Sequence, residues 1–307
     1  MQAHNYQTLN DTLDYLENLG INAIELMPPG EFENNESWGY NPSYHMALDK
    51  YYGTPDAFKT FIDECHARGI AVIVDIVLNQ AYGQSPLVQL YWDGPNNRPA
   101  ADNPWLNAVC PHSPYCWGYD FNHESQATKY FVDRVTKFWL TEYNIDGFRF
   151  DFTKGWTNTG NVGYCDIRIN CLKRMADQVW QVNPGAYVIL EHWADNNEEK
   201  RLSDYGMLLW GNVTYNYQEA AMGWVANSNF QWGIYKERGW NDPHLVTYME
   251  SHDEERLVYK NLEYGNSYGS YSVKDPITAL RRIELTAAFL FTVPGPKMIW
   301  QFGELGY

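Results

Sequence analysis

Four acidic side chains stand at or shortly after short apolar runs that are far apart in the chain. They are Asp75, Asp151, Glu191 and Asp253. A charge buried in a strand costs free energy unless it has a partner, so acids in these positions suggest chemistry. Two carboxyl groups can flank a glycosidic bond, and repulsion from a third acid raises the pKa of one of them enough for it to donate a proton. The pattern predicts acid–base chemistry in one pocket, provided that folding brings these acids together.

The apolar runs alternate with longer amphipathic segments, which is typical of parallel strands joined by helices. The sequence predicts seven strands, at 21–27, 70–78, 145–152, 186–191, 213–217, 245–250 and 297–302. It predicts helices at 8–19, 55–68, 125–142, 171–182 and 276–291. Active sites of α/β barrels form at the carboxyl ends of the strands. The four acids stand at such ends.

A closed TIM barrel, (β/α)8, needs eight strand–helix units. Seven strands are predicted, and a helix precedes the first of them. We therefore expect an α/β fold, a TIM barrel whose first strand lies before Met1 and whose last helix lies after Tyr307. All of 1–307 would be one catalytic barrel belonging to a longer protein with further domains. Residues 80–124, between the third and fourth barrel strands, lack periodicity and are too long for an ordinary connection, so they predict a functional excursion.

The composition narrows the classes of partner. The formal net charge is −16, from 22 basic and 38 acidic side chains, and no Lys or Arg cluster offsets it. Such a field repels a polyanion, so we expect no nucleic-acid partner and a neutral substrate. Aromatic residues make up 16% of the chain, with 13 Trp and 24 Tyr. These rings suit both stacking on sugars and a dense aromatic core.

The sequence gives weaker indications of compartment. No stretch of 18 or more apolar residues occurs, so no membrane span is expected. The first residues lack the apolar run of a signal peptide. Two close cysteine pairs, Cys110/Cys116 and Cys165/Cys171, suit loop disulfides. Disulfides and a polymeric substrate favour an extracellular or periplasmic location over the cytoplasm.

Four segments resemble the ordered signature regions of the α-amylase family, glycoside hydrolase family 13. They read DIVLNQ at 75–80, GFRFD at 147–151, VILEH at 188–192 and ESHD at 250–253. Residues 38–42, WGYNP, are similar to the family's segment after strand two, and 294–300, PGPKMIW, to its eighth strand. The likeness runs from about Leu19 to the end. It implies a TIM barrel in which 80–124 form a short domain B.

The resemblance implies a retaining mechanism with a covalent glycosyl–enzyme intermediate. Asp151 would be the nucleophile, Glu191 the general acid and base, and Asp253 the acid that grips sugar hydroxyls in subsite −1. Retention needs two carboxyl groups about 5 Å apart, one ionised and one protonated. Arg149 lies two residues before Asp151 on the same strand face and would keep the nucleophile ionised. Asp75 is expected to support Arg149 rather than to act on substrate.

The family also implies a set of substrate-binding residues. Tyr40 would stack beneath the −1 sugar, and His252 would donate a hydrogen bond to it. Lys154 would touch the sugar on the leaving-group side. His192 and Trp193 would border subsite +1, although Trp193 could equally cap the barrel core.

Two neighbouring positions bear on sugar and metal binding. Gln80 replaces the histidine that commonly contacts the −1 sugar, which predicts weaker binding there or altered specificity. Asn79 matches the family's frequent calcium ligand. One oxygen does not make a calcium site, which needs six to eight. No cofactor is expected for the chemistry itself, and a structural calcium ion is an open expectation.

The family includes several activities that share these catalytic residues. Lys154 favours an α-amylase-like hydrolase that cuts internal α-1,4-glucosidic bonds of starch or glycogen. The segments 31–42 and 250–253 are instead similar to branching and debranching enzymes, which act at α-1,6 linkages. A non-catalytic glucan-binding module is a further alternative. In each case the partner would be an α-glucan polysaccharide or a maltooligosaccharide.

Overall fold

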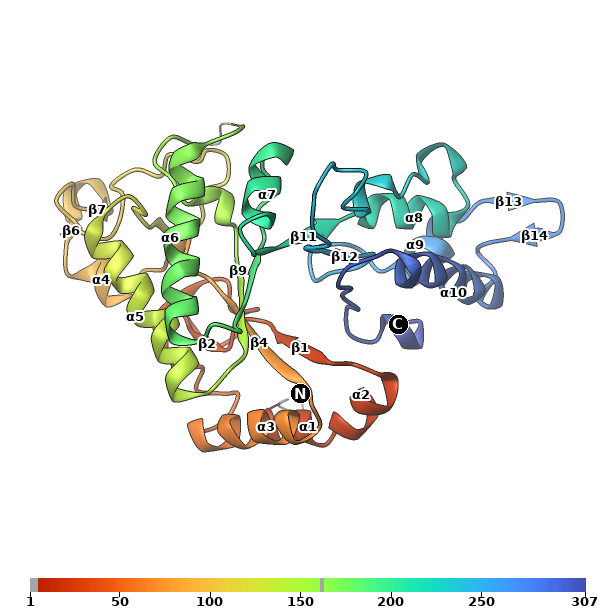
Figure 1. The fold of residues 1–307 in the computed structure, drawn as a ribbon, viewed down its shortest axis with the longest axis horizontal. Coiled ribbons are helices and arrows are strands. Elements are labelled where there is room, and N and C mark those ends of the chain that lie inside the picture. Colours follow the sequence, from red (N-terminus) through yellow and green to blue (C-terminus); the bar gives the residue numbers. More distant parts are fainter. Residues whose placement is uncertain (1–4, 161–162) are drawn as a thin grey trace. The chain divides into compact units, whose positions relative to one another are not determined.

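Figure 1 shows the computed structural model of the chain, which describes residues 5–160 and 163–307. The chain divides into two compact units, Met1–Glu198 and Glu199–Tyr307. In the described part of the chain no helix is both long and apolar enough to cross a bilayer.

The first unit is built on four parallel strands. In their order across the sheet they are β1 (Ala23–Leu26), β4 (Ala71–Ile76), β9 (Gly147–Phe150) and β10 (Tyr187–Leu190). All four residues of β9 are buried, as expected for a parallel strand covered on both faces. The register places Asp75 beside Arg149 and Leu190 beside Phe150. Strands β9 and β10 therefore end side by side, and the residues that follow them, Asp151 and Glu191, lie at the same edge of the sheet.

Helices cover the strands of the first unit. They are α1 (Tyr6–Asn10), α2 (Leu13–Leu19), α3 (Pro55–Ala67), α5 (Gln126–Glu142), α6 (Asp166–Val182) and α7 (Asn196–Ser203), the last of which continues into the second unit. Local signals set their ends: the Thr54 side chain caps α3 by accepting a hydrogen bond from the Ala57 amide, and Pro55 follows at the first helical position. Helices α5 and α6 pack side by side (Figure 1).

Short elements fill the loops of the first unit. They are the antiparallel pair β2 (Gly30–Phe32) and β3 (Pro42–Leu48), and, within 80–124, β5 (Gln80–Ala81), α4 (Pro86–Gln89), β6 (Trp92–Asp93), β7 (Arg98–Pro99) and β8 (Tyr119–Asp120). The excursion has a small apolar core of its own, formed by Ala81, Val88, Leu106 and Phe121. A disulfide joins Cys110 to Cys116.

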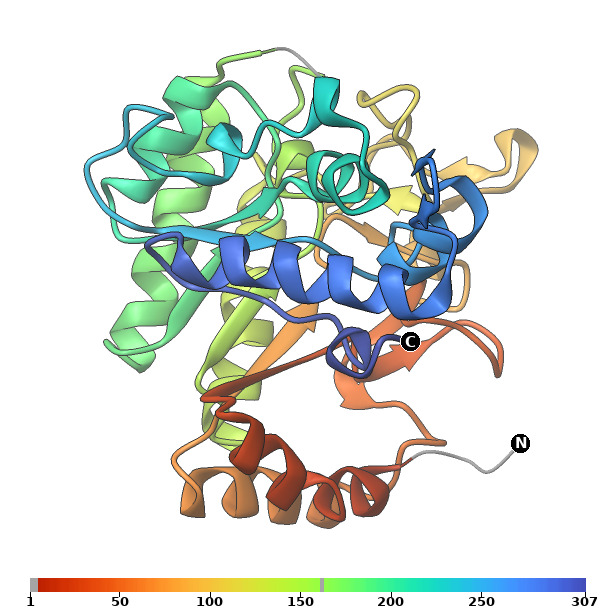
Figure 2. The ribbon, with the colours of Figure 1, turned by 90° about the vertical axis from the view of Figure 1, so that its right-hand side faces the viewer.

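The second unit contains the parallel strands β11 (Leu208–Asn212) and β12 (Leu245–Tyr248). Three helices accompany them: α8 (Thr214–Met222), α9 (Leu257–Tyr264) and α10 (Pro276–Thr292). These helices pack on one another (Figure 2). Their shared core includes Tyr217, Leu257 and Leu290. A short hairpin, β13 (Ser267–Tyr268) and β14 (Tyr271–Ser272), lies between α9 and α10 in the chain.

The α/β prediction is confirmed, with six parallel strands in the described residues, four in the first unit and two in the second. The strand predicted at 213–217 is wrong. Val213 and Tyr217 are four residues apart, which suits one face of a helix, and both pack into the core around α8. The strand predicted at 297–302 is reduced to one parallel bridge between Thr247 and Lys297. The helix predicted at 8–19 is divided into α1 and α2.

The cysteines separate into one bonded pair and three free thiols. Among the described residues Cys65, Cys165 and Cys171 are free. Cys165 caps α6 and Cys171 lies within it. Six residues of α-helix span about 9 Å, which exceeds the Cα separation of about 7 Å that a disulfide can bridge.

The close approach of β9 to β10 gives a first prediction. A Cβ atom at Gly147 would lie 2.6 Å from both the backbone nitrogen and the Cβ of Tyr187. We expect Gly147→Ala to lower the free energy of unfolding by about 1–3 kcal/mol, because the strands must move apart. Denaturant unfolding measures this loss. Gly94→Ala is the control, since a Cβ at Gly94 meets nothing within 4 Å in the described structure; an equal loss in both variants would contradict the prediction.

Candidate active site

A buried guanidinium forms the centre of the site. Arg149, on β9, has no exposed side-chain surface. Its Nη1 donates to both carboxylate oxygens of Asp75, at 2.9 and 3.1 Å, and to Oδ1 of Asp151 at 3.0 Å. Its Nη2 lies 2.9 Å from Oε2 of Glu191. Three acids that are far apart in the sequence therefore surround one cation.

The backbone fixes the level at which these acids stand. The Asp151 amide donates to the Ile76 carbonyl at 3.1 Å, and the Glu191 amide to the Phe150 carbonyl at 3.0 Å. These bonds continue the strand ladders by one residue. The amide of Phe152 then donates to Oε2 of Glu191 at 2.8 Å. Phe152, which follows Asp151, therefore holds the carboxylate of Glu191.

The chain turns sharply after each of these two acids. Phe152 has φ 41° and ψ 52°, and Trp193 has φ 46°. Bulky residues seldom adopt this left-handed region, and such strain concentrates at functional sites. Compensating bonds are present: the amide and the hydroxyl of Thr153 both donate to the Glu191 carbonyl, at 2.8 and 2.9 Å.

Burial governs the acidity of the cluster. It raises the pKa of Asp75 to about 6, although Arg149 opposes the shift. Burial, with repulsion from Asp75, also raises the pKa of Asp151 to about 6 against the attraction of Arg149. Arg149 therefore acts in the expected direction, but burial has the larger effect. Asp151 is largely ionised at neutral pH and becomes protonated in mild acid.

Tyr40 and Gln80 lie beside the cluster. The Tyr40 hydroxyl donates to Oδ2 of Asp75 at 2.6 Å, and its ring lies 5.9 Å from the Arg149 guanidinium. Gln80 is buried, donates through Nε2 to the Tyr40 carbonyl at 3.0 Å and accepts from Asn79 at 2.8 Å. Gln80 thus holds the backbone of Tyr40.

His192 lies inside the fold, with 1% of its surface exposed. Its Nδ1 is 2.9 Å from the Thr153 hydroxyl, and its Nε2 is 2.9 Å from Glu198. Glu198 also accepts from Arg168 at 2.7 and 2.8 Å. Burial opposes the charge on Glu198, but bonds from His192 and Arg168 outweigh it and lower the pKa to about 2. Both ring nitrogens of His192 therefore have protein partners.

The sequence analysis did not identify Arg168 and Glu198. A signal for Arg168 was present, because it lies on the same helical stripe as the buried residues Leu172, Met175 and Val179 of α6. A charge on an apolar stripe implies a buried partner. Glu198 carried no comparable signal.

Two predicted sugar contacts lie just beyond the acids. Lys154 is half-buried, and its carbonyl accepts from Nη1 of Arg168 at 3.1 Å. Trp193 is 39% exposed. Trp193 was expected either to border subsite +1 or to cap the barrel core. Its exposure excludes the core position and leaves it at the surface.

Asp253 and His252 belong to the second unit, where they follow β12. The Asp253 side chain is 46% exposed, and its Oδ1 lies 3.4 Å from Nε2 of His252. His252 is flanked by the rings of Trp210 and Trp300, at centroid distances of 6.1 and 6.0 Å. The Asp253 amide donates to the Ser251 hydroxyl at 3.1 Å. The meeting of Asp253 with Asp151 and Glu191 stays a prediction.

Asn79 offers one oxygen to a metal ion. Its Oδ1 is buried and has no hydrogen-bond partner in the part of the chain that the structure describes. Across residues 5–160 and 163–307 no group of three or more His, Cys, Asp or Glu side chains could hold a metal. A calcium ion takes six to eight oxygens, so Asn79 alone does not meet the requirement. The calcium expectation stays a prediction.

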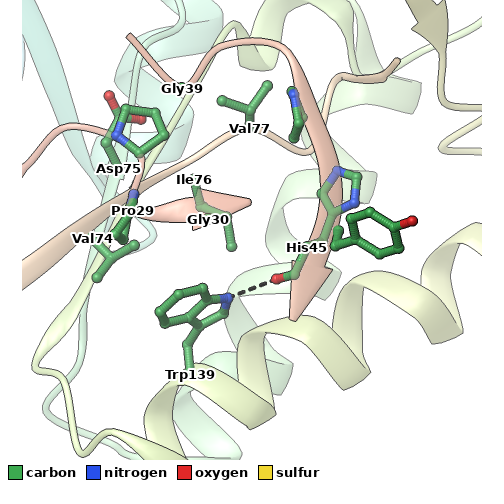
Figure 3. Close-up of a pocket in the computed structure, with 12 residues that line it drawn as sticks. Pro29, Gly30, Gly39, His45, Val74, Asp75, Ile76, Val77 and Trp139 are labelled. Atoms are coloured by element: carbon green, nitrogen blue, oxygen red, sulfur yellow. Dashed lines mark hydrogen bonds between the residues drawn. The ribbon is translucent and has the colours of Figure 1, made fainter. Parts of the chain in front are cut away.

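A small cavity lies next to Asp75, which forms part of its lining (Figure 3). Its volume is about 20 Å³, and its lining includes Pro29, Gly39, His45, Asp75 and Trp139. Trp139 closes it by donating from its indole to the His45 carbonyl at 2.9 Å. This volume holds about one water molecule, so the cavity is not a sugar site.

Parallel strands that end in two carboxylates bridged by a buried arginine suit acid–base chemistry of the kind that glycoside hydrolases use. A family model, "Alpha amylase, catalytic domain", matches residues 5–91. This segment matches the α-amylase family, glycoside hydrolase family 13, and relatives that the chain resembles over most of its length include 1,4-alpha-glucan branching enzymes. The family prediction is thus confirmed.

Several relatives resemble the chain over different lengths. The 1,4-alpha-glucan branching enzyme GlgB of Geobacillus stearothermophilus is 27% identical over 99% of the chain and 47% of its own length. The malto-oligosyltrehalose trehalohydrolase of Saccharolobus solfataricus is 33% identical over 45% of the chain and 23% of its own length. The α-amylase of Geobacillus thermoleovorans shares the fold, with a TM-score of 0.75 at 19% identity over 99% of the chain and 65% of that structure. The chain thus spans less than half of the curated relatives named here.

The raised pKa of Asp75 gives a second prediction, on stability. A pKa that folding raises from 3.8 to about 6 means that the folded state binds more protons between these values. This contribution is complete below about pH 4 and is lost as the pH rises through 6. Relative to Asp75→Asn, the wild type should therefore gain about 1–2 kcal/mol in free energy of unfolding between pH 7 and pH 4.5.

Denaturant unfolding at a series of pH values measures this difference. Asp102→Asn is the matched control, because Asp102 is exposed, and its difference from the wild type should not change with pH. A difference between wild type and Asp75→Asn that is flat from pH 7 to 4.5 would contradict the assignment.

Proposed function

We propose that this chain is the catalytic region of a retaining enzyme that cleaves α-1,4-glucosidic bonds and transfers the released chain to another glucan, as a branching enzyme does. The observation that carries the retaining chemistry is that Asp151 and Glu191 both contact one buried guanidinium, that of Arg149. Similarity to a 1,4-alpha-glucan branching enzyme over 99% of the chain supports transfer rather than simple hydrolysis.

The mechanism proceeds in two displacements at one carbon. Asp151 attacks the anomeric carbon, while Glu191 protonates the departing glycosidic oxygen. The covalent glycosyl–Asp151 intermediate then reacts with an acceptor hydroxyl, whose proton returns to Glu191. Each step inverts the carbon, so the product retains the α configuration. In branching the acceptor is the 6-hydroxyl of a glucan, and in hydrolysis it is water.

Neighbouring side chains act on the acids or on the sugar. Arg149 compensates the charge of Asp151 and, once Glu191 has given its proton to the leaving oxygen, the charge of Glu191 as well. Asp75 holds Tyr40, whose ring faces the −1 sugar in this proposal. We assign His192 a positioning role, since both its nitrogens bond within the protein. Asp253 and His252 would bind hydroxyls of the same sugar.

Hydrolysis of internal α-1,4 bonds is the second candidate. Lys154 favours it, because it stands three residues after Asp151, where α-amylases typically carry a lysine. Arg168 and the turn after Asp151 hold the backbone of Lys154 at this point. Both candidates use the same acids and differ in the acceptor.

Amylose separates the two candidates. A branching enzyme should shift the colour of the iodine complex with little new reducing sugar, because each broken bond is replaced by a new one. A hydrolase should release reducing ends in step with the loss of colour. Asp151→Asn serves as the blank. Reducing ends that rise in proportion to the loss of colour would overturn the branching assignment in favour of hydrolysis.

Substitutions of the acids test the mechanism itself. Asp151→Asn and Glu191→Gln should each lower turnover of maltooligosaccharides at least about 100-fold, with circular dichroism unchanged. Glu191→Gln should keep much more activity on aryl glucosides whose leaving group needs no proton, whereas Asp151→Asn should lose both activities. The exposed Asp102→Asn should behave as the wild type. Near-normal turnover in either acid variant would refute the roles assigned.

A further inference from the structure

Three aromatic rings lie together, and one of them belongs to Phe152, the residue after Asp151. Trp117 and Phe152 meet nearly at right angles, with ring centroids 5.0 Å apart. Tyr115 lies 6.1 Å from Trp117 and 6.0 Å from Phe152. Tyr115 and Trp117 come from the excursion and are 45% and 44% exposed. The cluster thus presents large apolar rings to solvent.

This cluster begins one residue from the nucleophile. Phe152 directly follows Asp151, and its amide donates to Glu191. The left-handed backbone of Phe152 directs the chain away from β9 at this point. Through Phe152 the ring cluster is therefore joined directly to the residues that carry the two acids.

The rings are not needed for the core of the excursion. That core is formed by Ala81, Val88, Leu106 and Phe121.

The loop that carries Tyr115 and Trp117 is nevertheless fixed in place. The disulfide Cys110–Cys116 closes it just before Trp117. Gly118 follows with φ 54°, and a Cβ there would lie 2.6 Å from the Ala81 carbonyl, so the backbone packs closely on β5.

We propose that Tyr115, Trp117 and Phe152 form a stacking platform for the glucosyl rings of an α-glucan chain as it leaves the acid pair. The apolar faces of sugar rings match aromatic faces, which offer a large contact area at low conformational cost. The substrate is neutral, so the strongly acidic surface of the protein does not repel it. The platform rests on the proposed function for its ligand, but binding to it needs no turnover.

The test measures binding of maltoheptaose to the chain carrying Asp151→Asn, which prevents turnover. Isothermal titration gives Kd, and quenching of tryptophan fluorescence reports on the rings. Adding Trp117→Ala should raise Kd roughly five- to tenfold and remove most of the quenching. Adding Trp117→Phe should restore most of the affinity, because a stacking ring remains.

Trp92→Ala is the matched control. Trp92 is a tryptophan of the same excursion with similar exposure, but its ring contact is with Tyr119, and Kd should not change. Equal maltoheptaose affinity with and without Trp117→Ala would overturn the platform and leave the proposed function intact. No maltoheptaose binding in the Asp151→Asn parent would overturn both. Thermal unfolding of each variant verifies that the fold is retained.

Discussion

The buried guanidinium of Arg149 is the interaction on which the site depends. Three carboxylates with little contact with water would repel one another and unfold the strand ends, but one cation between them offsets much of that repulsion. Removing a single partner from such a cluster costs about 3–5 kcal/mol, because the remaining charges stay buried. Arg149 also spans three strands: it lies on β9, its register partner Asp75 lies on β4, and Glu191 follows β10. Fold and site are therefore stabilised by the same contacts.

A second set of bonds fixes the backbone just after Asp151. Phe152 and Trp193 adopt backbone conformations that are unfavourable for their residue types, and the cost must be met by surrounding contacts. Thr153 supplies two bonds to the Glu191 carbonyl. The buried group of His192, Glu198 and Arg168 holds Thr153 from behind. The acid cluster is thus positioned both from the strands and from helix α6.

The sequence predicted the parts that depend on local pattern. Buried strands read as continuous apolar runs, so polar residues at their ends, such as Asp75, Asp151 and Glu191, stood out. The segment Val213–Tyr217 was wrongly predicted as a strand, because β-branched and aromatic residues also suit a strand. Only its packing against α9 and α10 decides for a helix. The partners of His192 could not be predicted, since Glu198 meets it through tertiary folding. The same holds for Tyr115 and Trp117, whose contact with Phe152 depends on how the disulfide loop folds back.

The acid cluster by itself cannot select between transfer and hydrolysis. In the proposed mechanism both reactions pass through the same glycosyl–Asp151 intermediate, and Glu191 accepts a proton from whichever hydroxyl attacks. Selection must come from how long a glucan hydroxyl, rather than water, occupies the position next to that intermediate. Water is always present at high concentration, so transfer requires surfaces that hold an acceptor chain and exclude water near the acids. The proposed platform of Tyr115, Trp117 and Phe152 would meet both requirements, whereas a polar, open surface there would leave water as the acceptor.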